Sequence, residues 1–270
     1  MSSLITIITP CFNGALFATQ YVHMLRAQTF QEWIAIIVDD HSTDQSYALL
    51  HSLVAGDPRF LLHHNIPPLS PGPSSARNYA ISVSDSPYIA FCDIDDIWHP
   101  TKLSAQYHFH ISNQLDLSVT SYARFTRSKP FIIRSIRHPP VHLNYNTLLS
   151  GNPIPLSSVL ISRSLLASHL FLPIKHEDYD LWLTLFRSFP ALRYGSLRDI
   201  LMYYRVHEDS LSSNKILMPA WVLSVFRKQG YSLPSSFFLV TRWCILRLFT
   251  YFMDITHPFR GTPADFTPRI

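Results

Sequence analysis

The chain has few charged residues and almost no cysteine. Asp, Glu, Lys and Arg make up 15% of its 270 residues and apolar residues make up 47%, which excludes an intrinsically disordered protein. The three cysteines, Cys11, Cys92 and Cys244, are far apart and lie in apolar settings. Neither a disulfide framework nor a zinc site is therefore indicated, and we expect a reducing, cytoplasmic environment.

Uninterrupted apolar segments and basic runs are also missing. Arg242 and Arg247 interrupt the most apolar stretch, 237–253, and each would be costly at the centre of a bilayer, so we do not expect a transmembrane helix. The net charge is +4 but Lys and Arg are scattered, which disfavours nucleic acid as a partner and suits anionic lipid or a phosphorylated ligand equally well. No Lys or Arg precedes Arg26, so the N-terminus is expected to be a strand rather than a secretory signal.

What the first hundred residues do contain is apolar runs that alternate with helical patterns. Strands are predicted at 4–9, 33–38, 60–63 and 88–92, with helices at 15–28, from about 41 to 53, and at 76–82. This order predicts an open α/β sheet, in which ligands bind beyond the carboxyl ends of the strands. Five acids follow two of these runs: Asp39, Asp40, Asp93, Asp95 and Asp96.

The rest of the chain is more mixed. A helix is predicted at 178–189 and strand-like pieces at 116–122, 157–161 and 201–205, whereas residues 104–152 contain no recognisable motif. We expect one domain over 1–213, with a donor half (1–100) and an acceptor half (101–213), and a helical tail over 214–270.

The sequence Asp93-Ile94-Asp95 places two carboxylates at the end of a strand. Carboxylates together with phosphate oxygens suit Mn²⁺ or Mg²⁺, which would offset charge on a departing diphosphate. Taken alone, the pair could equally be an acidic turn that ends a strand.

The order of motifs resembles family 2 of the glycosyltransferases. The resemblance covers about residues 4–213 and implies the GT-A fold, a mixed, mostly parallel α/β sheet flanked by helices. It rests on seven stretches: Ile7-Ile-Thr-Pro-Cys-Phe-Asn13, Ala27-Gln-Thr-Phe30, Ile36-Ile-Val-Asp-Asp-His-Ser-Thr-Asp44, Ser75-Ala-Arg-Asn78, Tyr88-Ile-Ala-Phe-Cys-Asp-Ile-Asp-Asp-Ile-Trp-His-Pro100, Glu177-Asp-Tyr-Asp-Leu-Trp182 and Tyr203-Tyr-Arg-Val-His207.

The resemblance also implies a role for each matching residue. Asp40 would accept from a uracil ring with Asp39 in support, and Asp95 would be the principal ligand of Mn²⁺ or Mg²⁺. Glu177-Asp178 would be the acidic catalytic pair, with Asp178 as general base. The remaining implied residues are Thr9, Pro10, Asn13, Arg77, Asp93 and Ile94 for the nucleotide-diphosphate sugar donor, and Asp93 and His207 for the metal.

These roles agree with the chemistry of an inverting transfer, which needs one base for the acceptor hydroxyl and positive charge for the leaving phosphate. Each motif also has a purely structural alternative. Asp39-Asp40 could simply end a strand, and the acids at 177–180 could complement a helix dipole. Arg77 could be solvent-exposed, and His207 could have a structural role. One departure from the family pattern is His41, where a glycine commonly follows the acid pair, so the turn there must avoid or tolerate a positive φ.

A helix over 237–253 would carry Arg242, Arg247, Thr250 and Asp254 within one sector of roughly 140° and be apolar elsewhere. It could lie in a membrane interface with its arginines toward lipid headgroups, which suits a lipid-linked acceptor at the inner face of the cytoplasmic membrane. Packing on the domain or on a second subunit is the open alternative.

Taken together, the sequence predicts an inverting glycosyltransferase that moves a sugar from a nucleotide-diphosphate donor to a glycan or lipid-linked acceptor in cell-surface polysaccharide synthesis. A sugar-phosphate nucleotidyltransferase is disfavoured, because it needs a glycine-rich loop after the first strand, and the chain has seven glycines in all. A non-catalytic sugar-nucleotide-binding or membrane scaffold protein is the other alternative.

Overall fold

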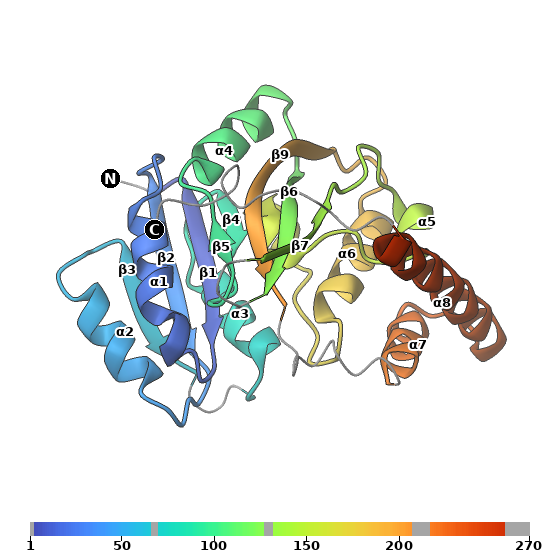
Figure 1. Cartoon of the computed structure of the whole chain (residues 1–270), viewed down its shortest axis with the longest axis horizontal. Helices are drawn as coiled ribbons and strands as arrows, with labels where there is room; N and C mark the ends of the chain where they lie inside the picture. Colours follow the sequence, from blue (N-terminus) through green and yellow to red (C-terminus); the bar gives the residue numbers. More distant parts are fainter. Residues whose placement is uncertain (1–2, 66–69, 127–131, 207–216, 257–270) are drawn as a thin grey trace.

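The computed structural model describes residues 3–65, 70–126, 132–206 and 217–256. Figure 1 shows a twisted sheet with helices packed around it, and a helical region that projects from the edge opposite the first strands. Within the described residues the sheet has nine strands, in the order β3-β2-β1-β4-β8-β6-β9-β5, with β7 paired to β6.

The first half of the sheet is parallel. It consists of β1 (Ile5–Cys11), β2 (Trp33–Asp39), β3 (Phe60–His64) and β4 (Tyr88–Phe91), with β1 between β2 and β4. Side chains alternate along β1, so that Ile7 packs in one apolar core and Ile8 in the other. Because both faces of β1, β2 and β4 are buried, their sequences are continuously apolar rather than alternating.

The second half of the sheet is mixed. Strand β8 (Val159–Ser162) runs antiparallel to β4 and to β6 (Leu117–Thr126), while β9 (Tyr194–Arg205) runs parallel to β6. Strands β5 (Ile97–Trp98) and β7 (Ile132–Arg137) pair antiparallel with β9 and β6. The predicted mixed α/β sheet is confirmed, with most of its parallel pairs in the donor half.

Helices cover both faces of the sheet. The helices α1 (Ala15–Arg26) and α2 (Ser46–Val54) pack on one face, and α3 (Pro73–Ser82) packs on the other. The later helical elements are α4 (Lys102–Ser112), α5 (Tyr145–Leu148), α6 (Glu177–Ser188), α7 (Met218–Lys228) and α8 (Leu233–Thr256), with 3₁₀ turns η1 (Leu156–Ser158) and η2 (Arg163–Leu166).

The helical tail shares a core with the α/β body. Val222 and Phe226 of α7 and Val240 and Trp243 of α8 are buried in the same apolar cluster as Trp182 of α6. One face of α8 therefore packs against the body. Figure 1 shows α8 beside α7 at this end of the molecule. None of the helices in the described part of the chain is long and apolar enough to cross a membrane. A separate domain boundary near residue 213 stays a prediction.

Candidate active site

The acids that follow β2 lie beside the end of β1. Strand register pairs Cys11 with Asp39, and the backbone N–H of Asp40 donates to the carbonyl oxygen of Cys11 over 2.7 Å. Both acids are almost fully buried, at 3% and 7% exposure. His41 follows with φ = 63°, so this turn does require a left-handed residue, and histidine adopts the conformation that glycine would adopt more easily.

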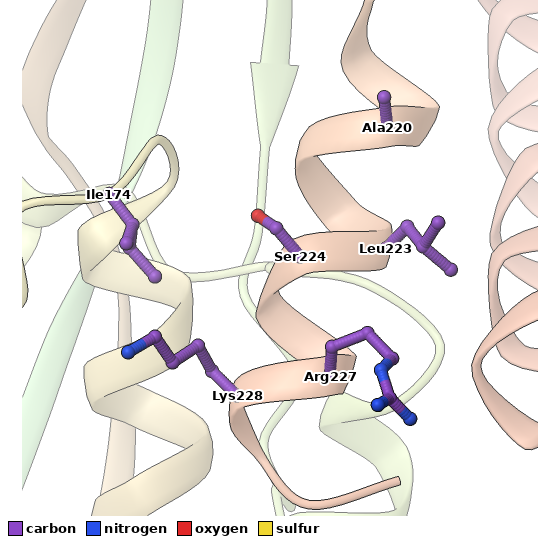
Figure 2. Close-up of a pocket in the computed structure, with 6 residues that line it drawn as sticks. All are labelled: Ile174, Ala220, Leu223, Ser224, Arg227 and Lys228. Atoms are coloured by element: carbon purple, nitrogen blue, oxygen red, sulfur yellow. The ribbon is translucent and has the colours of Figure 1, made fainter. Parts of the chain in front are cut away.

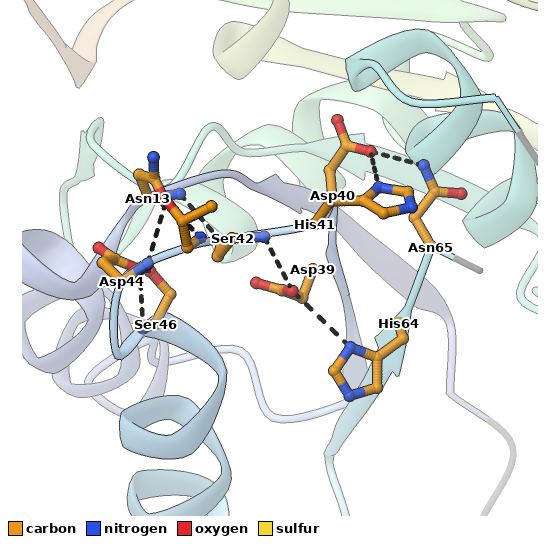
Figure 3. A network of polar contacts seen from close by, with 10 residues as sticks. Asn13, Asp39, Asp40, His41, Ser42, Asp44, Ser46, His64 and Asn65 are labelled. Carbon is orange, nitrogen blue, oxygen red and sulfur yellow. Dashed lines mark hydrogen bonds and ion pairs between the residues drawn. The ribbon is translucent and has the colours of Figure 1, made fainter.

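The two adjacent carboxylates have different surroundings (Figure 3). Asp40 is surrounded by protein donors: Asn65 Nδ2 at 2.6 Å and His41 Nδ1 at 3.3 Å from Oδ1, and the Gly72 N–H at 2.8 Å from Oδ2. Asp39 accepts from the Ser42 N–H at its Oδ2, but its buried Oδ1 has no hydrogen-bond partner among the described residues. Asp39 therefore has the free acceptor atom of the pair.

Asn13 organises the loop after β2 rather than pointing into open space. Its Oδ1 accepts from the N–H groups of Thr43 and Asp44 at 2.8 and 3.3 Å, and its own N–H donates to Ser42 Oγ at 2.9 Å. Its backbone is left-handed, with φ = 48°, which asparagine tolerates better than most residues. Figure 3 shows these bonds joining the end of β1 to the loop at the start of α2.

The other residues expected at the nucleotide site, Thr9, Pro10 and Ile94, lie in β1 and in the loop after β4. Thr9 is fully buried and its hydroxyl shares a 2.6 Å hydrogen bond with the Tyr21 hydroxyl of α1. Pro10 follows it and is partly exposed. Ile94 is buried against the turn at Gly14, where a Cβ atom would lie 3.1 Å from the Ile94 side chain. Glycine at position 14 thus permits the close approach of these two segments.

Arg77 joins two acidic segments that are 84 residues apart in the sequence. Its Nη2 donates to Asp93 Oδ1 over 2.8 Å and its Nη1 donates to Glu177 Oε1 over 2.7 Å. The guanidinium is 6% exposed and lies 5.5 Å from the centre of the Phe171 ring. Burial disfavours its charge, but the two carboxylates outweigh burial and raise the pKa of Arg77 further. The arginine is therefore a fixed buried cation that holds the end of β4 against the start of α6.

Asp178 lies next to this ion pair and is partly buried. Its Oδ2 accepts from Asn152 Nδ2 and its Oδ1 from the Tyr179 N–H, both over 2.8 Å. Burial, and then the neighbouring Glu177 carboxylate, raise the pKa of Asp178 to about 7, although Arg77 and the two hydrogen bonds oppose the rise. A carboxylate with a pKa near neutrality is well matched to accept a proton at physiological pH.

The surroundings of Tyr204, on β9, show that the acidic loop (Asp93–Asp96) and Asp178 lie close together. Burial raises the pKa of Tyr204 above its usual range, and the charges of Asp96, Asp93, Asp95 and Asp178 raise it further. All four carboxylates therefore lie within electrostatic reach of one phenol. Burial, followed by the charges of Asp95 and Asp93, also raises the pKa of Asp96 well above its usual value.

Arg205 and Ser157 fix the shape of the acidic loop. The Arg205 N–H donates to Asp96 Oδ1 over 3.0 Å and its Nε donates to the Asp95 carbonyl oxygen over 2.8 Å. On the other side, the Asp93 N–H donates to Ser157 Oγ over 3.0 Å. From the Tyr-Arg-Val-His motif, only His207 was expected to have a role. The contacts of Tyr204 and Arg205 were not predicted from the sequence.

A second support, also missed from sequence, lies beneath this loop. Gln106 Nε2 donates to the carbonyl oxygens of Ser118 and Ser158 over 3.0 and 2.8 Å, and Lys102 Nζ donates to Gln106 Oε1 over 2.8 Å. Lys102 is fully buried with its Nζ 3.9 Å from the centre of the Trp98 ring, and burial lowers its pKa to about 7. The only signal in the sequence was the i, i+4 spacing of the two residues.

The loop between β4 and β5 contains the two acids expected to bind a metal ion. Asp93 and Asp95 lie together on one loop, but within the described ranges no group of three or more His, Cys, Asp and Glu side chains is placed to hold a metal ion. His207 lies outside the described residues. Carboxylates suit a hard cation that takes its remaining ligands from a diphosphate, so the residues fit a metal shared with the donor.

A separate hollow of about 450 Å³ lies beside α7 (Figure 2). It is lined by Ile174, Ala220, Leu223, Ser224, Arg227 and Lys228. None of these residues was expected in the donor site, and the hollow contains no carboxylate. It therefore lies outside the chemistry described above.

A parallel half-sheet with acids at the carboxyl ends of its strands is the arrangement of an α/β fold that binds a ligand at that edge. Residues 6–171 match the family described as Glycosyl transferase family 2. The chain belongs to this family and is a glycosyltransferase.

Sequence relatives include enzymes of surface polysaccharides. The chain is 33% identical to the Escherichia coli UDP-Glc:alpha-D-GlcNAc-diphosphoundecaprenol beta-1,3-glucosyltransferase WfaP, over 78% of this chain and 81% of the relative. It is 29% identical to the putative teichuronic acid biosynthesis glycosyltransferase TuaG of Bacillus subtilis, over 90% of this chain and 94% of that protein.

Solved structures with the same fold are more distant in sequence. Staphylococcus aureus TarS 1-349 in complex with UDP-GlcNAc superposes with a TM-score of 0.69 at 17% identity, covering 89% of this chain and 71% of that chain. Mycobacterium tuberculosis glucosyl-3-phosphoglycerate synthase with Mn²⁺, UDP and glucosyl-3-phosphoglycerate superposes with a TM-score of 0.59 at 17% identity, covering 85% and 81%. At such identity the likeness establishes the fold alone.

Proposed function

We propose that this protein transfers a sugar, with inversion, from a UDP-sugar to a hydroxyl of a lipid-linked glycan acceptor. The observation that carries the proposal is the Arg77 bridge, which holds Asp93 of the donor half beside Glu177 and hence beside Asp178. One base and one site for the leaving diphosphate are what an inverting displacement at the anomeric carbon needs.

The donor is held at the carboxyl ends of β1 and β2. We assign the contact with the N–H of a uracil ring to Asp39, because its Oδ1 is unpaired among the described residues whereas both Asp40 oxygens already accept from protein donors. This reverses the roles that the sequence suggested for the two acids. UDP is also the nucleotide named for WfaP and for the TarS complex.

Asp95 and Asp93 would hold Mn²⁺ or Mg²⁺, with His207, outside the described residues, as a further ligand. When bound, the ion supplies positive charge to the departing diphosphate. Arg77 shares Asp93 with this site and pairs with Glu177 on its other side.

Asp178 is the general base. It takes the proton from the acceptor hydroxyl as the oxygen attacks the anomeric carbon, and no covalent sugar intermediate is needed. Asn152 and the Tyr179 N–H hold the carboxylate by one oxygen each, which fixes its orientation toward the acceptor. Glu177 is a positioning residue: its ion pair with Arg77 holds the start of α6, which carries the adjacent Asp178, near Asp93.

The acceptor is assigned from the relatives. WfaP is named for a diphosphoundecaprenol-linked acceptor and a β linkage, and UDP-glucose carries an α-linked sugar, so that reaction inverts the anomeric centre. By analogy, this protein acts in cell-surface polysaccharide synthesis at the cytoplasmic face of the membrane. Residues 1–213 form the catalytic unit in this proposal and 214–270 form a tail that serves the lipid-linked acceptor.

The proposal is tested by incubating the protein with UDP-, GDP- and dTDP-sugars, Mn²⁺ or Mg²⁺, and a synthetic polyprenyl-diphosphate N-acetylhexosamine. We expect a product with one β-linked hexose only from a UDP-sugar, and Asp178→Asn should lower turnover by about 10²–10⁴-fold. UDP affinity, measured by calorimetry, should be retained in that variant.

Asp199→Asn is the matched control, since Asp199 is an exposed acid on β9 remote from the bridge. Retained turnover in Asp178→Asn would rule out the assigned base. UDP-sugar binding without transfer or donor hydrolysis under any metal would favour the alternative of a non-catalytic sugar-nucleotide-binding protein.

A further inference from the structure

Helix α8 has an apolar face that nothing in the described chain covers. Phe237, Phe238, Ile245 and Leu248 are 55%, 70%, 61% and 68% exposed, and Leu233 at the helix start is 51% exposed. Single exposed apolar residues are ordinary on protein surfaces, but a row of large ones along one helix marks an interaction surface.

Helix geometry separates this face from the packed one. At 100° per residue, the exposed positions 237, 238, 241, 245 and 248 fall within a sector of about 100°. The opposite side carries Ser236, Leu239, Val240 and Trp243, which are buried against the body. Because the inner face is already packed, the outer one is free for a partner.

The arginines are placed differently from the sequence expectation. Arg242 donates to Ser150 Oγ over 2.7 Å, and the Arg247 guanidinium lies 5.7 Å from the centre of the Trp243 ring. Both therefore lie on the side of α8 opposite the exposed apolar face, in contact with the protein rather than extended toward a membrane. Thr250 and Asp254 lie beyond the side chains that the structure describes.

The charged residues of α7 and α8 within 217–248 are all basic: Arg227, Lys228, Arg242 and Arg247. From Ser210 to Met253 the sequence contains five Lys and Arg residues and no Asp or Glu. Two of them, Arg227 and Lys228, are exposed at the end of α7, and Arg227 Nη1 donates to the Tyr231 carbonyl oxygen, two residues before α8 begins. Figure 2 shows both side chains at the same end of α7, with Arg227 on the side of α8 and Lys228 on the side of α6.

Helix α8 is also connected to Asp178 through the loop 150–152. Arg242 bonds Ser150, and a Cβ atom on Gly151 would lie 3.7 Å from the Trp243 ring, so the loop 150–151 packs directly on α8. The next residue, Asn152, holds Asp178. A partner bound to α8 would therefore lie on the same side of the molecule as the Asn152 loop that holds Asp178.

From these observations we propose that Leu233, Phe237, Phe238, Ile245 and Leu248 dock on an anionic lipid bilayer, with Arg227 and Lys228 beside the headgroups. The helix lies along the surface, with apolar side chains in the headgroup and acyl boundary and basic residues near lipid phosphates. A second copy of the chain fits less well, because residues 217–248 of each copy, which include four Lys and Arg and no Asp or Glu, would meet with like charge. Membrane docking does not depend on the reaction that the protein catalyses. Only the statement that docking brings the active site to a lipid-linked acceptor rests on the proposed function.

The test is co-sedimentation of the full chain with vesicles of phosphatidylcholine alone or mixed with phosphatidylglycerol. We expect binding to the anionic vesicles that weakens with salt. Phe238→Ser/Ile245→Ser should lower partitioning by at least about tenfold, and Arg227→Gln/Lys228→Gln should lower it on anionic vesicles only.

Leu61→Ser/Val83→Ser is the matched control, because Leu61 on β3 and Val83 after α3 are exposed apolar residues in the donor half. Thermal unfolding should be unchanged in both serine pairs. Wild-type protein that stays in solution with anionic vesicles, or a Phe238→Ser/Ile245→Ser variant that sediments like wild type, would overturn the proposal. A dimer seen by light scattering that this variant abolishes would assign the face to a second copy instead.

Discussion

Asn152 Nδ2 lies 2.8 Å from Asp178 Oδ2 and donates a hydrogen bond to it from a loop that packs on α8. The bond favours the ionised carboxylate, while burial and the charge of Glu177 favour the protonated one. The balance between these effects determines at which pH Asp178 can act as a base.

We expect kcat/KM to rise with pH through about 7, the pKa of Asp178, because only the ionised carboxylate accepts a proton. At pH 6 a base with this pKa is about one-tenth ionised, so activity should be about one-tenth of its plateau. Asn152→Ala should move the acid limb to higher pH, and Glu177→Gln should move it to lower pH. Initial rates between pH 5.5 and 9 measure both shifts, and a shift of both variants in one direction would contradict the assignment.

Replacing Arg77 by methionine should lower the free energy of unfolding by about 3 kcal/mol, the lower end of the range for breaking a buried ion pair, because Asp93 is partly solvated. The variant leaves Asp93 and Glu177 facing each other without a cation, so transfer activity should fall with stability. Urea denaturation measures the first effect. Arg193→Met, which breaks an exposed pair with Asp116, is the control and should cost much less. Equal losses in the two variants would argue against the bridge.

The buried Lys102 should make stability depend on pH. Its pKa is about 7 in the fold and 10.5 in the unfolded chain, so the unfolded state binds more protons between these values. The free energy of unfolding therefore gains up to about 1.4 kcal/mol per pH unit as pH rises from 7 toward 10.5, from this group alone. Lys102→Met should remove that slope, measured as the difference between wild type and variant in urea at pH 7 and pH 9. Parallel stability curves would show that Lys102 remains charged.

Asp39→Asn should weaken UDP binding by about 10–100-fold, since a hydrogen bond to a charged group contributes about 1.5–3 kcal/mol. Asp40→Asn should have a smaller effect on affinity, because the Asp40 oxygens accept from Asn65, His41 and Gly72 in the free protein. It should instead lower the melting temperature. Calorimetric titration with UDP distinguishes the two acids, and a larger affinity loss in Asp40→Asn would restore the roles first expected from sequence.

Helix α4 shows why part of the fold could not be predicted from the sequence. Its buried face carries Lys102, Gln106 and His110 alongside Leu103, so a polar stripe faces inward and the apolar periodicity that marks an amphipathic helix is absent. These side chains are buried because each finds a partner: Gln106 for Lys102, and β6 for Gln106 and His110. Such partners come from distant segments and leave no local pattern.

The sequence alone determined the strands β1, β2 and β4, because strands buried on both faces must be continuously apolar, and it placed acids where those strands end. The order of its motifs also determined the glycosyltransferase family. Only the tertiary structure decided that Arg77 joins Asp93 to Glu177, that Asp39 rather than Asp40 has a free oxygen, and that the outer face of α8 is the apolar one. Those outcomes depend on which distant groups meet and exclude water, and periodicity within a segment carries no information about them.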